Sequence, residues 1–339
     1  MPEALHLRPA PQLPLPMRAP SPAATRPEGF EMLVDAFVAD DAPDLFNRAA
    51  FHRLHRHRPG IGAGAFLQWR QGSSGRICAT FQALETEPGY FASPGRGSYG
   101  GFDLAGDLGC AEIADFVTAA EAHLQELGAR RLGLVLPPFC YAPGRAALVL
   151  STLLGAGYVV ERHELNQSID LQHARLSSRR NYLISRARRE GLSTTLLAPR
   201  DYQEAHAVLV ESREKKGLTL SMSWPDVAEM AEAFPDALRV FGAYHGGSMV
   251  AAAICIAVNP RQLYVYTWGE RRGSEPLSPV TLIADTLYRH ARAGGFQRLD
   301  LGASSIGGVV NHGVYAFKKS LGATPSVKLF LGKTLSWRS

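Results

Sequence analysis

The chain has 339 residues, of which 46% are hydrophobic and 20% are charged, and its formal net charge is +5. These values are ordinary for a globular protein with more than one core and exclude a low-complexity chain. No apolar run approaches the ~20 residues that a membrane-spanning helix needs, and the start lacks a secretory signal pattern. We therefore expect a cytoplasmic protein without a membrane span, and the positive charge favours acidic ligands.

Two compositional features bound the chemistry further. Residues 1–28 contain eight prolines among scattered Arg and Ala, which predicts a flexible tail. The cysteines are far apart in the sequence, which predicts neither a disulfide framework nor a metal site and favours a reducing compartment. They are Cys78, Cys110, Cys140 and Cys255.

The chain repeats itself at a constant offset of 167 residues. Residues 128–134 read GARRLGL and residues 295–301 read GFQRLDL. In the same register, LGA at 154–156 recurs at 321–323. Two matches without a gap between them indicate a duplicated unit.

Each copy shows the same order of predicted elements. Apolar spacings of three and four predict helices, short apolar runs predict strands, and glycines punctuate them. The first copy is predicted to contain hairpin strands at 65–69 and 76–84, a helix at 112–127, a strand at 131–136 and a helix at 144–154. The second is predicted to contain strands at 238–244, 249–258 and 262–268, a helix at 280–293, a strand at 298–301 and a helix at 311–320. We expect mixed α/β layers with a partly antiparallel sheet, in domains 29–170 and 171–339.

Polar side chains of interest occur only in the second copy. After the last of its short strands, residues 302–308 are small, and small residues at a strand end let a ligand approach backbone N–H groups. At the offset of 167, Asp300, Asn311, Tyr315 and Lys318 stand opposite Gly133, Gly144, Leu148 and Ser151. The active site is therefore predicted in the second copy.

Several motifs of the second copy resemble the signature of Fem-like transferases, a branch of the GNAT superfamily. The motifs are RLDLGASS at 298–305, NHG at 311–313, FKKSLGA at 317–323, YVYTW at 264–268, Ser278-Pro279 and the Arg-rich segment 175–191. The resemblance covers residues 170–335 well and residues 30–170 in outline. It implies two tandem GNAT-like domains, of which the first is degenerate.

The resemblance also implies acyl transfer. It is compatible with an N-acyltransferase that moves an acyl group from acyl-CoA or a carrier thioester to an amine, and with a tRNA-dependent aminoacyltransferase. A non-catalytic binding protein of the same fold is a third possibility. The implied acceptor is a small-molecule or cell-envelope precursor amine, with no bound cofactor and no DNA partner. The usual GNAT pyrophosphate motif is absent before the helix at 280, where the sequence reads EPLSP at 275–279.

Specific residues follow from these expectations. Acyl transfer needs a proton acceptor, a charge that stabilises the oxyanion, and a cleft that holds both reactants. The predicted catalytic residues are Lys318, which the resemblance implies, and Asp300 or Glu270 as proton acceptor. The alternative for Asp300 is a structural role, in which it caps the loop. Substrate binding is predicted for Tyr266, Trp268, Ser304, Ser305, Asn311 and Tyr315. Donor phosphate binding is predicted for Gly302, Gly307 and Gly308, at a helix N-terminus, and for Arg179 and Arg186.

The helix predicted from Arg175 to Arg189 separates the two enzymatic alternatives. It carries six arginines. Either these form a solvated amphipathic face or they contact the phosphates of RNA.

Overall fold

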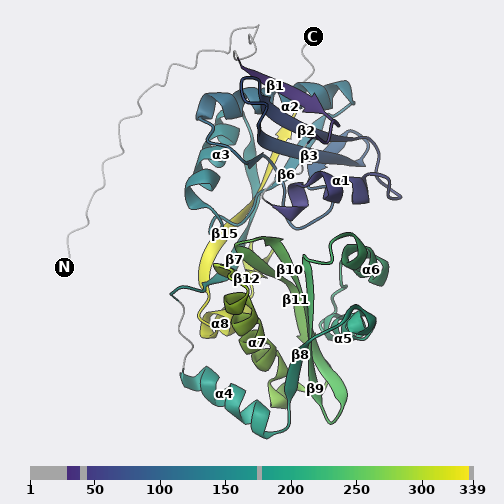
Figure 1. Cartoon of the computed structure of the whole chain (residues 1–339), viewed down its shortest axis with the longest axis vertical. Coiled ribbons are helices and arrows are strands. Elements are labelled where there is room, and N and C mark those ends of the chain that lie inside the picture. Colours follow the sequence, from purple (N-terminus) through teal and green to yellow (C-terminus); the bar gives the residue numbers. More distant parts are fainter. Residues whose placement is uncertain (1–28, 39–43, 174–177, 336–339) are drawn as a thin grey trace, which may run out of the picture.

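One mixed sheet runs through the whole molecule, and helices cover it in each half (Figure 1). The computed structural model describes residues 29–38, 44–173 and 178–335, so the tail predicted for residues 1–28 lies outside it. The sheet has 13 strands, in the order β1-β2-β3-β4-β6-β15-β7-β12-β11-β10-β9-β8, with β5 beside β3. The predicted mixed α/β fold with a partly antiparallel sheet is confirmed.

The first half builds one end of this sheet. Its strands are β1 (Phe30–Val34), β2 (Gly64–Gln71), β3 (Ile77–Glu87), β4 (Tyr90–Ser93), β5 (Asp103–Leu104), β6 (Arg131–Val135) and β7 (Val159–Asp170). Its helices are the 3₁₀ turn η1 (Leu45–Asn47), α1 (Ala49–Arg56), α2 (Cys110–Glu126) and α3 (Pro143–Gly155).

The second half builds the other end. Its strands are β8 (Ser193–Leu196), β9 (Leu238–His245), β10 (Ser248–Asn259), β11 (Gln262–Glu270), β12 (Arg298–Ala303) and β15 (Thr324–Thr334), and a separate hairpin contains β13 (Ser305–Ile306) and β14 (Val309–Val310). Its helices are α4 (Ser178–Arg189), α5 (Tyr202–Glu214), α6 (Trp224–Ala233), α7 (Pro279–Ala293) and α8 (His312–Ser320), with 3₁₀ turns η2 (Pro199–Asp201) and η3 (Glu275–Leu277).

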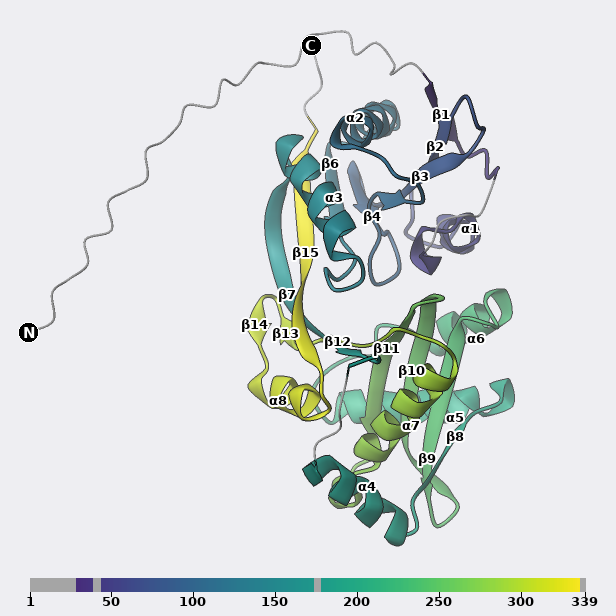
Figure 2. The ribbon, with the colours of Figure 1, turned by 60° about the vertical axis from the view of Figure 1, so that its left-hand side comes forward.

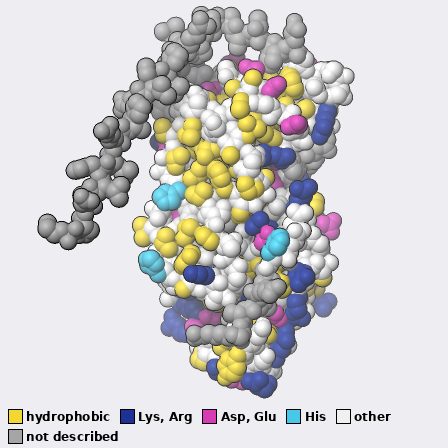
Figure 3. Space-filling view, turned by 90° about the vertical axis from the view of Figure 1, so that its left-hand side faces the viewer, with side chains coloured by type: hydrophobic (Ala, Val, Ile, Leu, Met, Phe, Trp, Pro, Cys, Tyr) yellow, Lys and Arg dark blue, Asp and Glu magenta, His cyan; other side chains and the backbone are white. Residues whose placement is uncertain are grey.

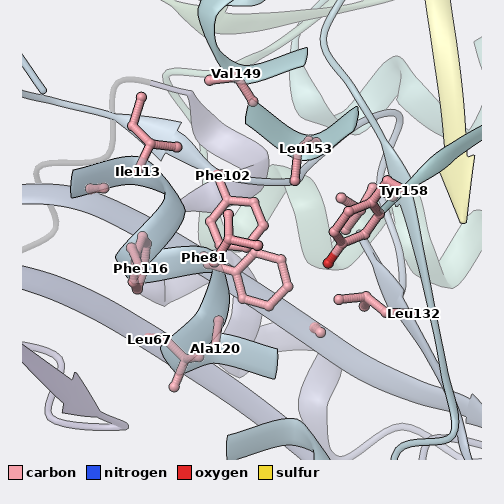
Figure 4. Packing of buried hydrophobic residues seen from close by; sticks show 14 of the residues in the cluster. Leu67, Phe81, Phe102, Ile113, Phe116, Ala120, Leu132, Val149, Leu153 and Tyr158 are labelled. Carbon is pink, nitrogen blue, oxygen red and sulfur yellow. The ribbon is translucent and has the colours of Figure 1, made fainter. Parts of the chain in front are cut away.

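The apolar stripe of α2 shows why the first half folds as predicted. Ile113, Phe116, Ala120 and Leu124 lie on one face, three or four residues apart, and all are fully buried. They pack with the inward side chains of the strands and of α3 (Figure 4). Gly128 ends the helix with φ of 94°, a conformation that favours glycine.

The last strand of each repeat pairs in the sheet of the other repeat. β7 follows α3 but pairs with β12 of the second half. β15 follows α8 but pairs with β6 of the first half. The two long strands also pair with each other, antiparallel, from Thr324↔Ser168 to Gly332↔Val159. Figure 2 shows both strands crossing the junction between the halves.

The described residues, 29–38, 44–173 and 178–335, contain neither a membrane-spanning helix nor a metal-binding cluster. None of their helices combines the length and apolarity that crossing a membrane requires. They contain no group of three or more His, Cys, Asp or Glu side chains arranged to hold a metal ion.

Candidate active site

Asp300 lies at the crossing of β12, β7 and the loop that precedes α3, and it is only 1% exposed. Its carboxylate accepts hydrogen bonds from the Tyr141 hydroxyl at 2.7 Å and from Asn166 Nδ2 at 2.8 Å. The backbone N–H of Gly302 also donates to it, at 2.8 Å. Residues from both halves therefore converge on one buried carboxylate.

Lys318 comes from α8 and reaches the same region. Its ammonium donates to the carbonyl oxygens of Gly302 at 2.9 Å and Ala303 at 2.6 Å. Burial lowers its pKa to about 8, and the nearby Asp300 carboxylate opposes this shift. The side chain is 3% exposed, so in this structure Lys318 holds the left-handed turn at Gly302 rather than facing an open cleft.

In the loop after β12, residues that were predicted to bind substrate or phosphate form hydrogen bonds to side chains of β7. The Ser304 hydroxyl donates to Gln167 Oε1 at 2.6 Å, and the Ser305 hydroxyl donates to Glu164. The N–H of Gly307 donates to Glu164 Oε1 at 2.8 Å. The expectation that this loop lies at a helix N-terminus is wrong, because the β13–β14 hairpin stands between the loop and α8. Gly308 lies in the turn of that hairpin, close to His163.

The remaining predicted residues lie apart from this crossing. Asn311 caps α8 by accepting from the N–H of Val314 at 3.0 Å, and Trp268 packs against Phe317. The backbone carbonyl oxygen of Tyr315 accepts a hydrogen bond from Gln167 Nε2 at 3.4 Å. Arg186 is on exposed α4, where it pairs with Glu190, and the side chain of Arg179 lies outside the described residues.

Glu270 is at the far end of β11, beside the start of α7. Its carboxylate accepts a hydrogen bond from the N–H of Val280, in the first turn of α7. Burial raises its pKa, which the neighbouring Lys215 partly opposes. A protein carboxylate therefore occupies the helix N-terminus at which GNAT domains usually hold a pyrophosphate.

A cavity of about 580 Å³ lies between the two halves, and we call it the central cavity. The loop after β4, helix α1, helix α6 and strands β6, β10, β11 and β15 contribute to its wall, and Figure 2 shows α1 and α6 on opposite sides of the junction. Its polar and charged lining residues are His55, Arg96, Ser98, Ser221, Asp226, Tyr266 and Lys328. Of the residues predicted for the site, Tyr266 alone lines this cavity, with its hydroxyl 2.5 Å from that of Ser221.

Lys328 of β15 also lines the central cavity, and it was not predicted from the sequence. Burial lowers the pKa of its ammonium to about 8, whereas Asp300 and Glu164 act in the opposite direction. Among the described residues the ammonium has no hydrogen bond or ion pair, and it lies 5.8 Å from the centre of the Phe330 ring. The side chain is half-buried. A partly desolvated cation without a hydrogen-bond or ion-pair partner, facing a cavity, is the arrangement expected for a group that meets a ligand.

The other charges of the central cavity are paired. Asp226 accepts from Arg58 at 2.6 Å and from Arg96 at 3.0 Å. Burial raises the pKa of Asp226, but hydrogen bonds from Ser223 and the two arginines outweigh it and hold this pKa below the usual value. Burial lowers the pKa of His55 to about 4, so this side chain is neutral at pH 7.

Comparisons with known proteins place this geometry in context. Residues 175–319 match the family model of the acetyltransferase (GNAT) domain. The chain is similar in structure to FemX, with 12% identity, coverage of 89% of this chain and 95% of that chain, and a TM-score of 0.67. No curated protein has a significantly similar sequence.

Two further solved structures share the fold. One is the C-terminal domain of a putative lysylphosphatidylglycerol synthetase from Agrobacterium fabrum, with 14% identity, coverage of 88% and 91%, and a TM-score of 0.58. The other is a tandem GNAT protein from the clavulanic acid biosynthesis pathway, with 14% identity, coverage of 91% and 100%, and a TM-score of 0.52. At such identities the similarity establishes the fold alone.

Proposed function

Because residues 175–319 form a GNAT domain and the chain has the fold of FemX, we propose that this protein is an N-acyltransferase whose reaction takes place in the central cavity. The donor is an acyl thioester and the acceptor is an amine. The observation that carries the proposal is the ammonium of half-buried Lys328, which faces the cavity and has no hydrogen-bond or ion-pair partner among the described residues.

The proposed step is direct transfer. The amine nitrogen attacks the thioester carbonyl carbon, and the carbonyl oxygen becomes an oxyanion. The carbon–sulfur bond then breaks, and the proton that the nitrogen gives up passes to the leaving thiolate, so that an amide and a free thiol result. Lys328 stabilises the oxyanion, because a fixed cation in a site of low dielectric is worth more than one in water. With a pKa of about 8, it is mostly protonated at pH 7.

The residues predicted from the sequence keep roles in this proposal. Asp300 and Lys318 act as positioning residues, because both hold the turn at Gly302 beside the strands that carry the cavity wall. Asp300 also favours the charged form of Lys328. Tyr266, with Ser221, lines the place where the acceptor would bind.

One observation favours an alternative to coenzyme A as the donor. Glu270 already fills the N-terminus of α7, where a pyrophosphate would meet a like charge. An aminoacyl-tRNA would instead need an exposed basic surface. Figure 3 shows lysine and arginine side chains gathered around the lower end of the molecule, where Figure 1 places α4. The acceptor in either case is a small-molecule or cell-envelope precursor amine.

The test is an activity assay with a matched pair of variants. Purified protein is incubated with short and long acyl-CoAs and a panel of amines comprising amino acids, an amino sugar and a polyamine, and released thiol is measured. We expect Lys328→Met to lower kcat/KM by about 100-fold or more, in line with loss of one oxyanion-stabilising group. Lys319→Met, on the exposed face of α8, serves as the control and should retain full activity.

Two outcomes contradict the proposal in different ways. If thiol release is unaffected in Lys328→Met, the reaction does not use the central cavity. If no acyl-CoA reacts, aminoacyl-tRNA is tested next, with a variant in which Arg186 and Arg189 are replaced by Gln. Failure with both donors would support the third possibility, a binding protein that retains the fold.

A further inference from the structure

A second cavity, of about 300 Å³, lies between α3 and the β10–β11 turn, and we call it the α3 cavity. Residues that follow β6, the first two turns of α3 and the turn residues 259–262 line it. It shares no lining residue with the central cavity. The acyl-transfer reaction proposed above makes no use of it.

Two carboxyl side chains lie together in its wall. Asp44 and Asp103 are each 8% exposed, and the N–H of Asp44 donates to Asp103 Oδ2 at 3.3 Å. Asn259 Nδ2 donates to Asp44 Oδ1. Among the described residues no lysine, arginine or histidine forms an ion pair with either carboxylate. Arg145 lines the same cavity and its charge acts on both carboxylates, but it forms an ion pair with neither. Two neighbouring buried carboxylates without a direct ion pair are unfavourable unless a cation joins them.

The same wall contains a third polar side chain, which has no hydrogen-bond partner in the described part of the chain. Gln262 is 5% exposed and lines the α3 cavity. Its backbone N–H donates to Asn259 Oδ1, but its side-chain amide has no hydrogen bond to any described residue. A buried primary amide normally finds a partner, so this one indicates a polar group supplied by a ligand.

Apart from Tyr141, Asn259 and two exposed arginines, Arg145 and Arg261, the remaining lining residues are apolar. Phe102, Leu136 and Val149 are buried around the cavity, and Pro137 and Ala146 complete this side. The volume lies at the lower end of the range for small-molecule sites. We propose that the α3 cavity binds a small molecule with an apolar body and a primary ammonium group, with the ammonium held between Asp44 and Asp103 and a polar atom at Gln262.

The ionisation of the pair agrees with this chemistry. Burial raises the pKa of Asp44 to about 6 and that of Asp103 to about 7, and the charge of Asp44 contributes to the shift of Asp103. The hydrogen bond from Asn259 and the charges of Arg145 and Arg48 oppose the shift of Asp44, and Arg145 also opposes that of Asp103. At pH 8 both carboxyls are therefore mostly ionised and require a cation. A bound ammonium would remove the repulsion that raises these pKa values.

The test uses three probes of the same shape at pH 8 and low ionic strength. Phenethylamine is cationic, 2-phenylethanol is neutral, and phenylacetate is anionic. Binding to the full-length protein is measured by calorimetry and by ligand-detected NMR. We expect phenethylamine to bind at least tenfold more tightly than 2-phenylethanol, and phenylacetate not to bind. Equal affinity for the amine and the alcohol, or no binding of the amine, would overturn the proposal.

Variants locate the bound amine. Asp103→Asn keeps the shape of the side chain but removes its charge, and it should weaken phenethylamine binding by tenfold or more. Asp107→Asn is the matched control, since Asp107 is exposed four residues away, and it should bind like the parent protein. If Asp103→Asn does not fold, Ala146→Phe is used instead, because a ring at this position of α3 fills the cavity. Binding that survives in the folded variant would place the amine elsewhere and refute the assignment.

Discussion

Burial lowers the pKa of both Lys318 and Lys328 to about 8, but the two side chains have opposite surroundings. Lys318 donates to two carbonyl oxygens and is almost fully enclosed. Lys328 has no partner among the described residues and faces the central cavity. A lowered pKa reports burial alone, whereas the hydrogen-bond partners distinguish a lysine that holds the backbone from one that meets a ligand.

The largest expected effect on stability comes from replacing Asp300, whose carboxylate lies near both lysines. Asp300→Ala removes the acceptor for Tyr141, Asn166 and the N–H of Gly302 and leaves them unpaired in the interior. We expect the free energy of unfolding to fall by about 3 kcal/mol, measured by urea denaturation. Asp107→Ala, at an exposed position, should change it by less than about 0.5 kcal/mol. If Asp300→Ala and Asp107→Ala have the same small effect, the hydrogen bonds to Asp300 do not stabilise the fold.

The two lysines themselves should respond in opposite directions. Lys318→Met leaves the carbonyls of Gly302 and Ala303 without their donor and should lower the free energy of unfolding by about 2 kcal/mol. Lys328→Met removes a desolvated charge that has no hydrogen bond, so stability at pH 7 should stay constant or rise by about 1 kcal/mol. A lower free energy of unfolding for Lys328→Met than for Lys318→Met, measured in urea, would contradict the different roles assigned to the two lysines.

The pH dependence of kcat tests the role assigned to Lys328. The group is charged below a pKa of about 8 and loses its proton above it, so oxyanion stabilisation should fall as the pH rises through 8. Lys328→Arg stays charged over this range. The ratio of the parent kcat to the Lys328→Arg kcat should therefore decrease as the pH rises. Well above pH 8, this decrease should approach tenfold per pH unit. Using the ratio cancels the titration of the acceptor amine and of Lys318, and a flat ratio would exclude this role.

The smallest expected effect concerns the start of α7. Glu270→Gln removes the negative charge from the helix N-terminus and should strengthen coenzyme A binding about two- to fivefold, in calorimetric titrations. Glu232→Gln, on the exposed side of α6, should leave the affinity unchanged. Weaker binding in Glu270→Gln would show that donor phosphates do not approach this helix.

Much of the fold could be predicted because local patterns determine it. The helices expected at 112–127 and 280–293 are α2 and α7, with boundaries within two residues. Apolar spacing and the glycines that follow were sufficient there. The exchange of β7 and β15 could not be predicted in this way, because period and turn chemistry identify a strand but not its partner. The division at residue 170 therefore remains a proposal, since β15 lies on the other side of it from its partner β6.

The candidate site was predicted less completely than the fold. Asp300, Lys318 and the serines of the loop were found because they differ from their counterparts in the first repeat, and the structure brings them together. Lys328 was missed because a lysine in a strand is usually solvated. The alternation of β15 held a signal, since Leu329 and Leu331 point into the core of the first half and Lys328 points to the opposite face.

The exchanged strands also set the order in which the chain can fold as it leaves the ribosome. β6 is made early, yet one of its two neighbours in the sheet is β15, the last strand in sequence. Until β15 emerges, the edge of β6 is open and the first half lacks part of its core, including Leu329, Leu331 and Leu335. Such an edge invites pairing with other chains. Nascent chains stalled before residue 324 should therefore require chaperones, and the N-terminal half matures only after translation has passed the C-terminal one.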